Sequence, residues 1–235
     1  MKIHNQRNRE GTRYVTDNLI LKDAVRDFKR SVEITRDVRF QANLRLAARQ
    51  RTSAYIVSFL SLYVIALSLI PNILDLKPVQ SQVLLACSIV LSVFIIFTSL
   101  IDSAQNFYHR GELLHQCARK IANIHHSLKN IDIDLDPDKA HKAFEALQGE
   151  YAKALDECPV NHENVDFYFE MVRKPHLFPA DYPARWKMLL RLWFRIKAWI
   201  LQWLWLVPHT SAFLVISVIV YVLVMRGSAP AGTSH

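Results

Sequence analysis

Two long apolar segments joined by a short loop constrain this chain most. They are AYIVSFLSLYVIALSLIPNIL, residues 54–74, and VLLACSIVLSVFIIFTSLI, residues 83–101, and neither contains Asp, Glu, Lys, Arg or His. A helix needs about 20 mostly apolar residues to cross roughly 30 Å of hydrocarbon. The pattern therefore predicts a transmembrane helical hairpin. The alternative is a buried hairpin in a soluble core, which needs more covering protein than 235 residues supply.

Basic residues predict how the hairpin is oriented. The connecting loop carries only Lys77 against Asp75, whereas cations gather before the first span and after the second: Arg45, Arg49, Arg51, Arg110, Arg119 and Lys120. Because Lys and Arg accumulate on cytoplasmic loops, both ends of the hairpin are expected in the cytoplasm.

A third apolar segment, LVPHTSAFLVISVIVYVLVM, covers residues 206–225 and follows a basic stretch without acids. Its N-terminal side is therefore expected in the cytoplasm and the C-terminus outside. We expect an all-α membrane protein with the following parts: a basic cytoplasmic helix 1–50, the hairpin 51–102, an acidic cytoplasmic helical region 103–181, a basic interfacial helix 182–205, a third transmembrane helix 206–226 and an external tail 227–235.

All five tryptophans lie within residues 186–205, together with four cations, and a fifth cation, Arg185, comes directly before them. Tryptophan concentrates at membrane interfaces, so this stretch predicts a helix lying on the inner leaflet. One long tilted helix from Trp199 to Met225 is the alternative. The predicted membrane-surface anchors are Arg45, Arg49, Arg51, Arg185, Trp186, Lys187, Arg191, Trp193, Arg195, Lys197 and Trp199.

Charge is unevenly distributed along the chain. Residues 1–53 hold 13 Lys and Arg against 6 Asp and Glu, whereas residues 102–181 hold 9 against 14. The basic parts are those that approach the membrane, where each cation gains about 1 kcal/mol beside anionic lipid. Membrane lipid is thus the favoured partner, and nucleic-acid binding by the amino-terminal helix is the alternative.

The segments outside the spans show apolar residues three and four positions apart, which predicts helices. We expect one from Asp17 to Arg51, capped by Thr16, Asp17 or Asn18, and one over residues 103–128 that continues directly out of the second span. A third opens at Asp136 and Pro137 and ends near residue 157. Their narrow apolar stripes suit a bundle within one chain or between subunits.

No residue pattern points to catalysis or to a cofactor. The chain lacks GxSxG, HExxH and P-loop motifs. The acidic run from Asp132 to Asp138 lacks the glycine and the final glutamate of a calcium loop. Cys87, Cys117 and Cys158 are scattered, so reduced thiols are expected, without a disulfide or metal site. The chain is therefore not expected to be an enzyme.

Two segments carry a family resemblance. They are FYHRGELLHQCARKIANI, residues 107–124, and YAKALDECPVNHENVDFYF, residues 151–169. With the basic helix and the hairpin they resemble the SLATT domain, a two-transmembrane effector domain of bacterial antiviral and conflict systems. The second segment resembles the subgroup found beside reverse transcriptases. The resemblance covers roughly residues 15–180 and leaves the third span outside.

The resemblance implies an effector that forms a homo-oligomer in the bacterial inner membrane and permeabilises it. The implied trigger is a sensor partner that detects phage, either a reverse transcriptase with RNA or a nucleotide second-messenger system. Two alternatives remain at this stage: a non-conducting scaffold that tethers a partner enzyme or nucleic acid, and a small housekeeping channel.

Serines form a stripe in each span of the hairpin. The candidate pore-lining or helix-packing residues are Ser58, Ser61, Ser68, Ser88, Ser92, Ser99 and Asp102. Small hydroxyl residues allow helices to approach closely, and they also suit a poorly selective aqueous path. The pattern does not separate the two roles.

Asn161, His162 and Asp166 precede an aromatic pair in the acidic region. Short polar side chains at this spacing are typical of a helix cap. They are equally the candidates for a contact with the sensor or trigger.

Overall fold

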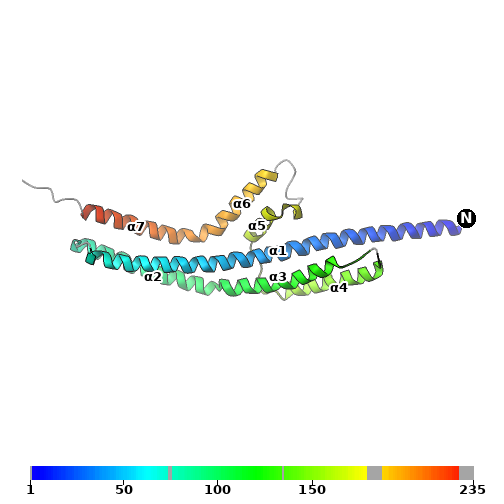
Figure 1. Cartoon of the computed structure of the whole chain (residues 1–235), viewed down its shortest axis with the longest axis horizontal. Coiled ribbons are helices and arrows are strands. Elements are labelled where there is room, and N and C mark those ends of the chain that lie inside the picture. The colour runs from blue at the N-terminus through cyan, green and yellow to red at the C-terminus, as the bar shows by residue number, and fades with distance from the viewer. Residues whose placement is uncertain (1, 74–75, 134, 179–186, 228–235) are drawn as a thin grey trace, which may run out of the picture. The chain divides into compact units, whose positions relative to one another are not determined.

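A computed structural model describes the backbone of residues 2–73, 76–133, 135–178 and 187–227. All regular structure in these ranges is helical, which confirms the all-α prediction. The elements are α1 (Lys2–Ile73), α2 (Pro78–Gln105), α3 (Phe107–Lys129), α4 (Pro137–Asp156), α5 (Asn164–Arg173), the 3-10 turn η1 (Pro175–Leu177), α6 (Lys187–Trp203), the 3-10 turn η2 (Leu204–Leu206) and α7 (Val207–Gly227) (Figure 1).

Helix α1 joins the basic segment and the first span without a break. The prediction that a helix starts at residues 16–18 is wrong, because α1 already begins at Lys2. Residues 43–51, rich in Leu, Ala and Arg, are good helix formers and carry the helix across the junction. Pro71 lies in the last turn, where a missing N–H and a steric clash favour the end of the helix at Ile73.

The second span does not continue directly into the next helix, contrary to the prediction. Helix α2 ends at Gln105, and Asn106 adopts the left-handed conformation with φ 46° and ψ 46°. Its backbone N–H donates to the carbonyl of Ser103 at 3.2 Å. Asn tolerates this conformation better than most residues, so one left-handed residue separates α2 from α3, which starts at Phe107.

The packing divides the chain into two compact units. We call Met1–Arg45 with His109–Ala198 the bundle unit, and Leu46–Tyr108 with Trp199–His235 the span unit. Helix α1 contributes to both units.

In the bundle unit α1, α3 and α4 enclose an apolar core (Figure 1). Val32 of α1 and Ile121 of α3 are fully buried, and Phe28 meets Phe144 of α4 edge to face at 5.5 Å between ring centroids. The predicted start of α4 is confirmed, because the side chain of Asp136 accepts a hydrogen bond from the backbone N–H of Lys139 at 3.1 Å. Burial of these apolar faces holds the three helices together.

In the span unit α1, α2 and α7 pack around leucines. Leu67 of α1 and Leu84 and Leu91 of α2 have no exposed surface. Two hydrogen bonds tie α7 to the hairpin: Gln80 donates to the carbonyl of Leu223 at 2.9 Å, and the hydroxyls of Tyr63 and Ser217 are 3.1 Å apart.

Three helical stretches of the described chain are long and apolar enough to cross a membrane. They lie within Asn18–Ile73, Pro78–Lys129 and Arg191–Leu223. The segment before the third span is α6, which ends at Trp203. The 3-10 turn η2 follows, and α7, which contains most of the third span, begins at Val207. Residues 187–227 therefore form two helices rather than one, and Pro208 occupies the first turn of α7, where its missing N–H costs nothing.

Cys117 and Cys158 form a disulfide. The prediction of separate reduced thiols is wrong for this pair, whereas Cys87 is free. Helix α4 folds back along α3, and this brings the two α-carbons to 5.9 Å although 41 residues separate them in the sequence.

Candidate functional site

The candidate control site is a polar seam within the bundle unit, where α5 meets α1. The Arg45 guanidinium donates two hydrogen bonds to the Asp166 carboxylate, from Nε to Oδ1 at 2.7 Å and from Nη2 to Oδ2 at 3.1 Å. Asp166 has no exposed surface and Arg45 is 8% exposed. Bidentate pairs of this kind fix both distance and orientation.

The same Asp166 also caps α5. Its Oδ2 accepts from the backbone N–H of Glu163 at 3.0 Å, which forms half of a capping box. The Glu163 carboxylate in turn lies 3.0 Å from Arg45. Asp166 therefore combines a helix cap with an internal ion pair, and its buried carboxylate can meet an outside partner only if the seam opens.

Asn161 and His162 lie at the entrance to this seam. The Asn161 side-chain oxygen accepts from the backbone N–H of His162 at 2.9 Å, and Asn161 itself is exposed. Burial lowers the pKa of His162 below its ordinary 6.5, Asp166 opposes that shift, and the Arg39 cation adds to it. The exposed amide of Asn161 is thus the member of the predicted trio most accessible to a partner.

A second polar cluster joins α1 to the end of α5, and the sequence analysis missed it. Lys174 Nζ donates to Asp37 at 2.6 Å and to Glu33 at 3.1 Å. Burial alone lowers the pKa of Lys174, but these two carboxylates raise it above its ordinary value. Glu33 and Asp37 lie four residues apart and so share one face of α1, but Asp23 and Asp27 have the same spacing, and the sequence alone does not single out the first pair.

Two further titratable groups are buried beside this cluster. Burial, together with the Arg36 cation, lowers the pKa of His125, whose Nδ1 lies 2.8 Å from Arg36 Nη1. Burial raises the pKa of Glu170, which is 1% exposed and pairs with Arg173 at 2.9 Å. The seam thus holds groups whose charge is sensitive to any loosening of α5.

Helix α6 is tied to α5 through an aromatic contact. Tyr168 stacks on Phe194 with 5.5 Å between ring centroids, and Lys197 donates to the Tyr168 hydroxyl at 3.0 Å. Lys197, one of the predicted surface anchors, therefore has a protein partner. Other anchors are exposed on α6 and suit a membrane surface: Arg191, Trp193, Arg195 and Trp199.

The anchors before the first span have three different environments. Arg45 is buried among the carboxylates of the seam rather than facing outward. Arg49 lies over the Phe107 ring at 4.2 Å and over the Trp205 ring at 5.2 Å, within the span unit. Arg51 is exposed. Residues 185 and 186 and the side chain of Lys187 lie outside the described part.

The serines of the two predicted stripes differ in their exposure but share one kind of hydrogen bond. Most of their hydroxyls donate to carbonyls three or four residues earlier in their own helix, at 2.8 to 3.0 Å: Ser58, Ser61, Ser68, Ser88 and Ser92. Ser58 and Ser68 are exposed, Ser88 is buried, and Ser61, Ser92 and Ser99 are half-buried. Leucines make up most of the buried core that α1 and α2 share with α7.

Asp102, at the end of the second stripe, is half-buried and accepts a hydrogen bond from the hydroxyl of Ser53. Ser53 is buried and was not among the predicted residues. This hydrogen bond joins the start of the first span, just after Ser53, to the end of the second span, just before Asp102. In the described ranges no three His, Cys, Asp or Glu side chains are grouped so that they could hold a metal ion.

Comparison with known families identifies the chain. Residues 21–223 match the SMODS and SLOG-associating 2TM effector domain family 5. The chain belongs to this family. The match to this SLATT family extends beyond the residues 15–180 that carried the resemblance, so α6 and most of α7 belong to the family pattern. No curated protein and no solved structure matches the chain.

The SLATT match and the three spanning stretches agree on one general statement. The chain is a membrane effector of a conflict system, because the family is a transmembrane effector domain and the described helices can cross a bilayer. The match does not address the subgroup found beside reverse transcriptases.

Proposed function

We propose that this protein is a pore-forming effector of bacterial anti-phage defence, located in the inner membrane and silent until a sensor partner signals. The observation that carries the proposal is the family match, which includes all three stretches able to cross a membrane. An effector with these spans and no catalytic motif acts most simply on the membrane itself. We propose abortive infection by permeabilisation as the outcome.

The conducting path in this proposal lies between copies of the chain. Within one copy, the core that α1, α2 and α7 share consists of apolar side chains, chiefly leucines. Ser58 and Ser68 are exposed on α1, and small residues there allow another helix to approach closely. Large apolar side chains such as Leu62 and Val93 are also exposed, and they suit contact with lipid or with other copies.

The control step in this proposal takes place at the seam. Helix α5 has only 10 residues, and both ion pairs and apolar packing on Ile34 hold it to α1. Loss of the Asp166 charge would leave the buried Arg45 without its bidentate partner. Arg45 is the last α1 residue of the bundle unit, and α1 continues without a break into the span unit. A sensor that displaces α5 would therefore act on the helix that carries the first span.

The proposed sensor is a reverse transcriptase with RNA or a nucleotide second-messenger system. Asn161 and His162 are the proposed first contacts, with Asp166 responding as the seam opens. Alanine at Asn161 should change when growth arrest occurs while membrane abundance stays normal, because its exposed side chain makes only one local hydrogen bond. Loss of protein in proportion to loss of arrest would assign the residue to the cap instead.

Dye or ion leakage on induced expression tests pore formation. Two double variants separate the exposed serine pair from the half-buried pair: Ser58→Leu with Ser68→Leu, and Ser61→Leu with Ser92→Leu. Bulky apolar groups dewet a narrow path and separate close helices, so leakage should fall at equal membrane abundance. The matched Ser→Ala doubles keep the helices close and should leak more than the Leu doubles. Unchanged leakage in both Leu doubles would refute a serine-lined path.

A reporter experiment tests the proposed topology. A reporter fused after His235 should be periplasmic, and one inserted near Pro137 should be cytoplasmic, because cations flank the cytoplasmic ends of the spans. Both reporters on one side would contradict either the third span or its orientation.

A second candidate function is a non-conducting scaffold that tethers a partner enzyme or nucleic acid. The excess of cations over residues 1–53 favours it. Salt-dependent co-purification of nucleic acid without any leakage would support the scaffold over the pore. The third candidate, a housekeeping channel, predicts leakage that does not depend on any sensor.

A further inference from the structure

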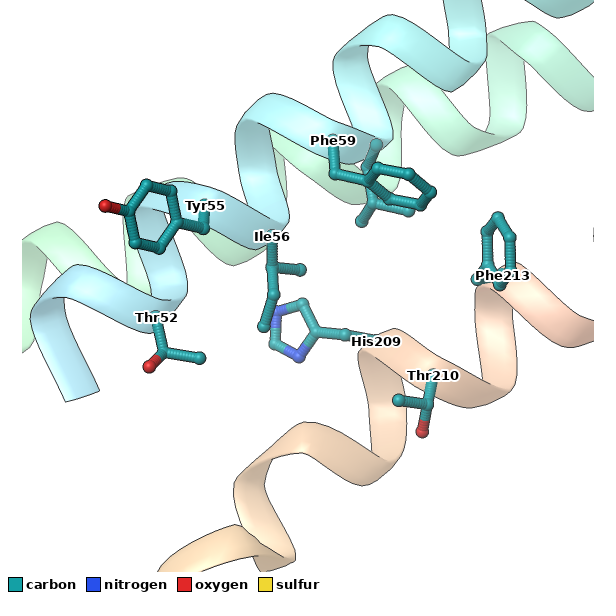
Figure 2. A pocket seen from close by; sticks show the side chains of 8 residues that line it. Thr52, Tyr55, Ile56, Phe59, His209, Thr210 and Phe213 are labelled. Carbon is teal, nitrogen blue, oxygen red and sulfur yellow. The ribbon is translucent and has the colours of Figure 1, made fainter. Parts of the chain in front are cut away.

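A pocket opens in the span unit between the start of the first span and the start of α7. It has a volume of about 310 Å³, and its walls are almost entirely apolar. Tyr55 and Phe59 of α1 line one side, and Phe213 of α7 lines the other (Figure 2). Such a volume is at the low end of the range for ligand pockets, roughly 300–1,000 Å³, and suits one chain rather than a whole lipid.

The polar side chains that line this pocket include His209, together with Thr52 and Thr210. The His209 side chain extends from α7 into the space beside Ile56 (Figure 2). It is 8% exposed, and neither ring nitrogen has a hydrogen-bond partner. Burying a neutral imidazole, with one donor and one acceptor nitrogen, is unfavourable unless something pairs with it. The position therefore calls for a ligand that offers hydrogen-bonding groups beside an apolar chain.

Cations lie at the same end of α1. Arg51 and Arg49 precede Thr52, which also lines the pocket, by one and three residues, a rise of about 1.5 Å and 4.5 Å along the helix. Arg49 lies over the Trp205 ring, and Trp205 meets His209 at 5.7 Å between ring centroids. Guanidinium groups, then an imidazole, then an apolar cavity thus follow one another along the direction into the membrane.

We propose that this pocket binds one anionic glycerophospholipid of the inner leaflet. One acyl chain fills the cavity, a glycerol ester carbonyl accepts the N–H of His209, and the phosphate lies near Arg49 and Arg51. A headgroup hydroxyl, as in phosphatidylglycerol, donates to the second ring nitrogen of His209. The order of phosphate, ester and chain in such a lipid matches the order of cation, imidazole and apolar wall in the protein.

The test compares three lipids on the full chain in detergent micelles. Phosphatidylglycerol should raise the melting temperature more than its ether-linked analogue, which lacks the ester carbonyl, and more than phosphatidylcholine, which lacks net charge. The ether analogue should bind about fivefold more weakly, the factor for one lost hydrogen bond. Equal shifts with ester and ether lipid would overturn the role of His209.

His209→Phe should abolish the difference between ester and ether lipid. Val218→Phe, a matched change at an exposed site on α7 outside the pocket, should keep it. Because His209→Phe can also disturb folding, native mass spectrometry of the unaltered chain provides an independent measurement. It should show phosphatidylglycerol retained in preference to both other lipids. A larger shift with a short-chain benzoquinone than with phosphatidylglycerol would overturn the proposal and assign the pocket to another class of lipid-phase molecule.

Discussion

The bundle unit and the span unit hold their helices together by different means. The bundle unit buries charges beside its apolar core, notably the Arg45–Asp166 pair and Glu170. The span unit is closed by leucines, with Gln80 and Tyr63 providing the hydrogen bonds between α7 and the hairpin. The two units should therefore respond differently to substitution, because a buried ion pair fails when one partner changes, whereas apolar packing weakens gradually.

The solvent explains the contrast. In water, burial of an apolar face stabilises a bundle, and charged pairs can be included where each member is satisfied. Within lipid, apolar side chains gain little from meeting one another, so shape and a few hydrogen bonds decide how the spans associate. Each prediction below perturbs one unit and uses the other as its reference.

The largest effect is expected for Asp166→Asn. Breaking this buried pair should cost about 3–5 kcal/mol, because the buried Arg45 loses its bidentate partner and the exposed Glu163 carboxylate replaces it only in part. Hydrogen exchange of the full chain should show faster exchange across α5 and unchanged protection of α2. Replacing both partners, Arg45→Met with Asp166→Leu, should recover much of the loss. Normal protection of α5 in the single variant would show that the seam does not hold the helix.

The next effect concerns the disulfide. Cys117→Ser should lower the stability of the bundle unit by about 2–4 kcal/mol, because the unfolded chain loses the constraint of a 41-residue loop. Thermal unfolding with and without a reductant measures it, and reductant should have no further effect on the variant. Cys87→Ser, which removes the free thiol of the span unit, is the control and should respond to reductant as the unaltered chain does.

In the span unit, Gln80→Leu should have a smaller effect, about 0.6 to 2 kcal/mol. It removes the hydrogen bond to the Leu223 carbonyl and should loosen the end of α7 without changing α5. Exchange at the C-terminal turns of α7 provides the measurement, with Tyr63→Phe as a parallel loss of one interhelical bond. A loss as large as that for Asp166→Asn would contradict the distinction between the units.

The smallest effect is a dependence on pH confined to the bundle unit. Folding lowers the pKa of His125 and His162, so the unfolded chain takes up protons first as pH falls through 6.5. The stability that the neutral rings provide is present above pH 6.5 and is lost as pH falls toward the lowered pKa values. Glu170, whose pKa is raised, acts in the opposite direction at lower pH, because the folded state takes up its proton first.

Unfolding followed between pH 7.5 and 5.5 should therefore show falling stability, with a shallower slope in His125→Gln. A slope that is unchanged in this variant would remove His125 from the explanation.

Local sequence signals predicted the spans and the start of α4 well. A long apolar run can be identified from consecutive residues alone. The Asp136–Pro137 cap can also be identified locally, because its hydrogen bond lies within the first turn of α4. The break at Asn106 was not predictable, because the segment on both sides of it favours a helix. The serines were correctly placed on spans, but their repeat does not say whether a hydroxyl bonds to its own helix, as Ser58 and Ser92 do here.

Composition and spacing were enough to predict an all-α membrane protein, because hydrophobic length and charge asymmetry are properties of neighbouring residues, whereas the SLATT family was recognised by resemblance and shown by the family match. The burial of Arg45 depends on its ion pair with Asp166, which lies 121 positions away in the sequence. The disulfide likewise depends on α4 folding back along α3. The same holds for His209, whose burial arises only because α7 packs against the hairpin. Contacts between distant segments follow from the packing of whole helix faces. This packing buries Arg45, which was predicted to lie at the membrane surface, in an ion pair with Asp166.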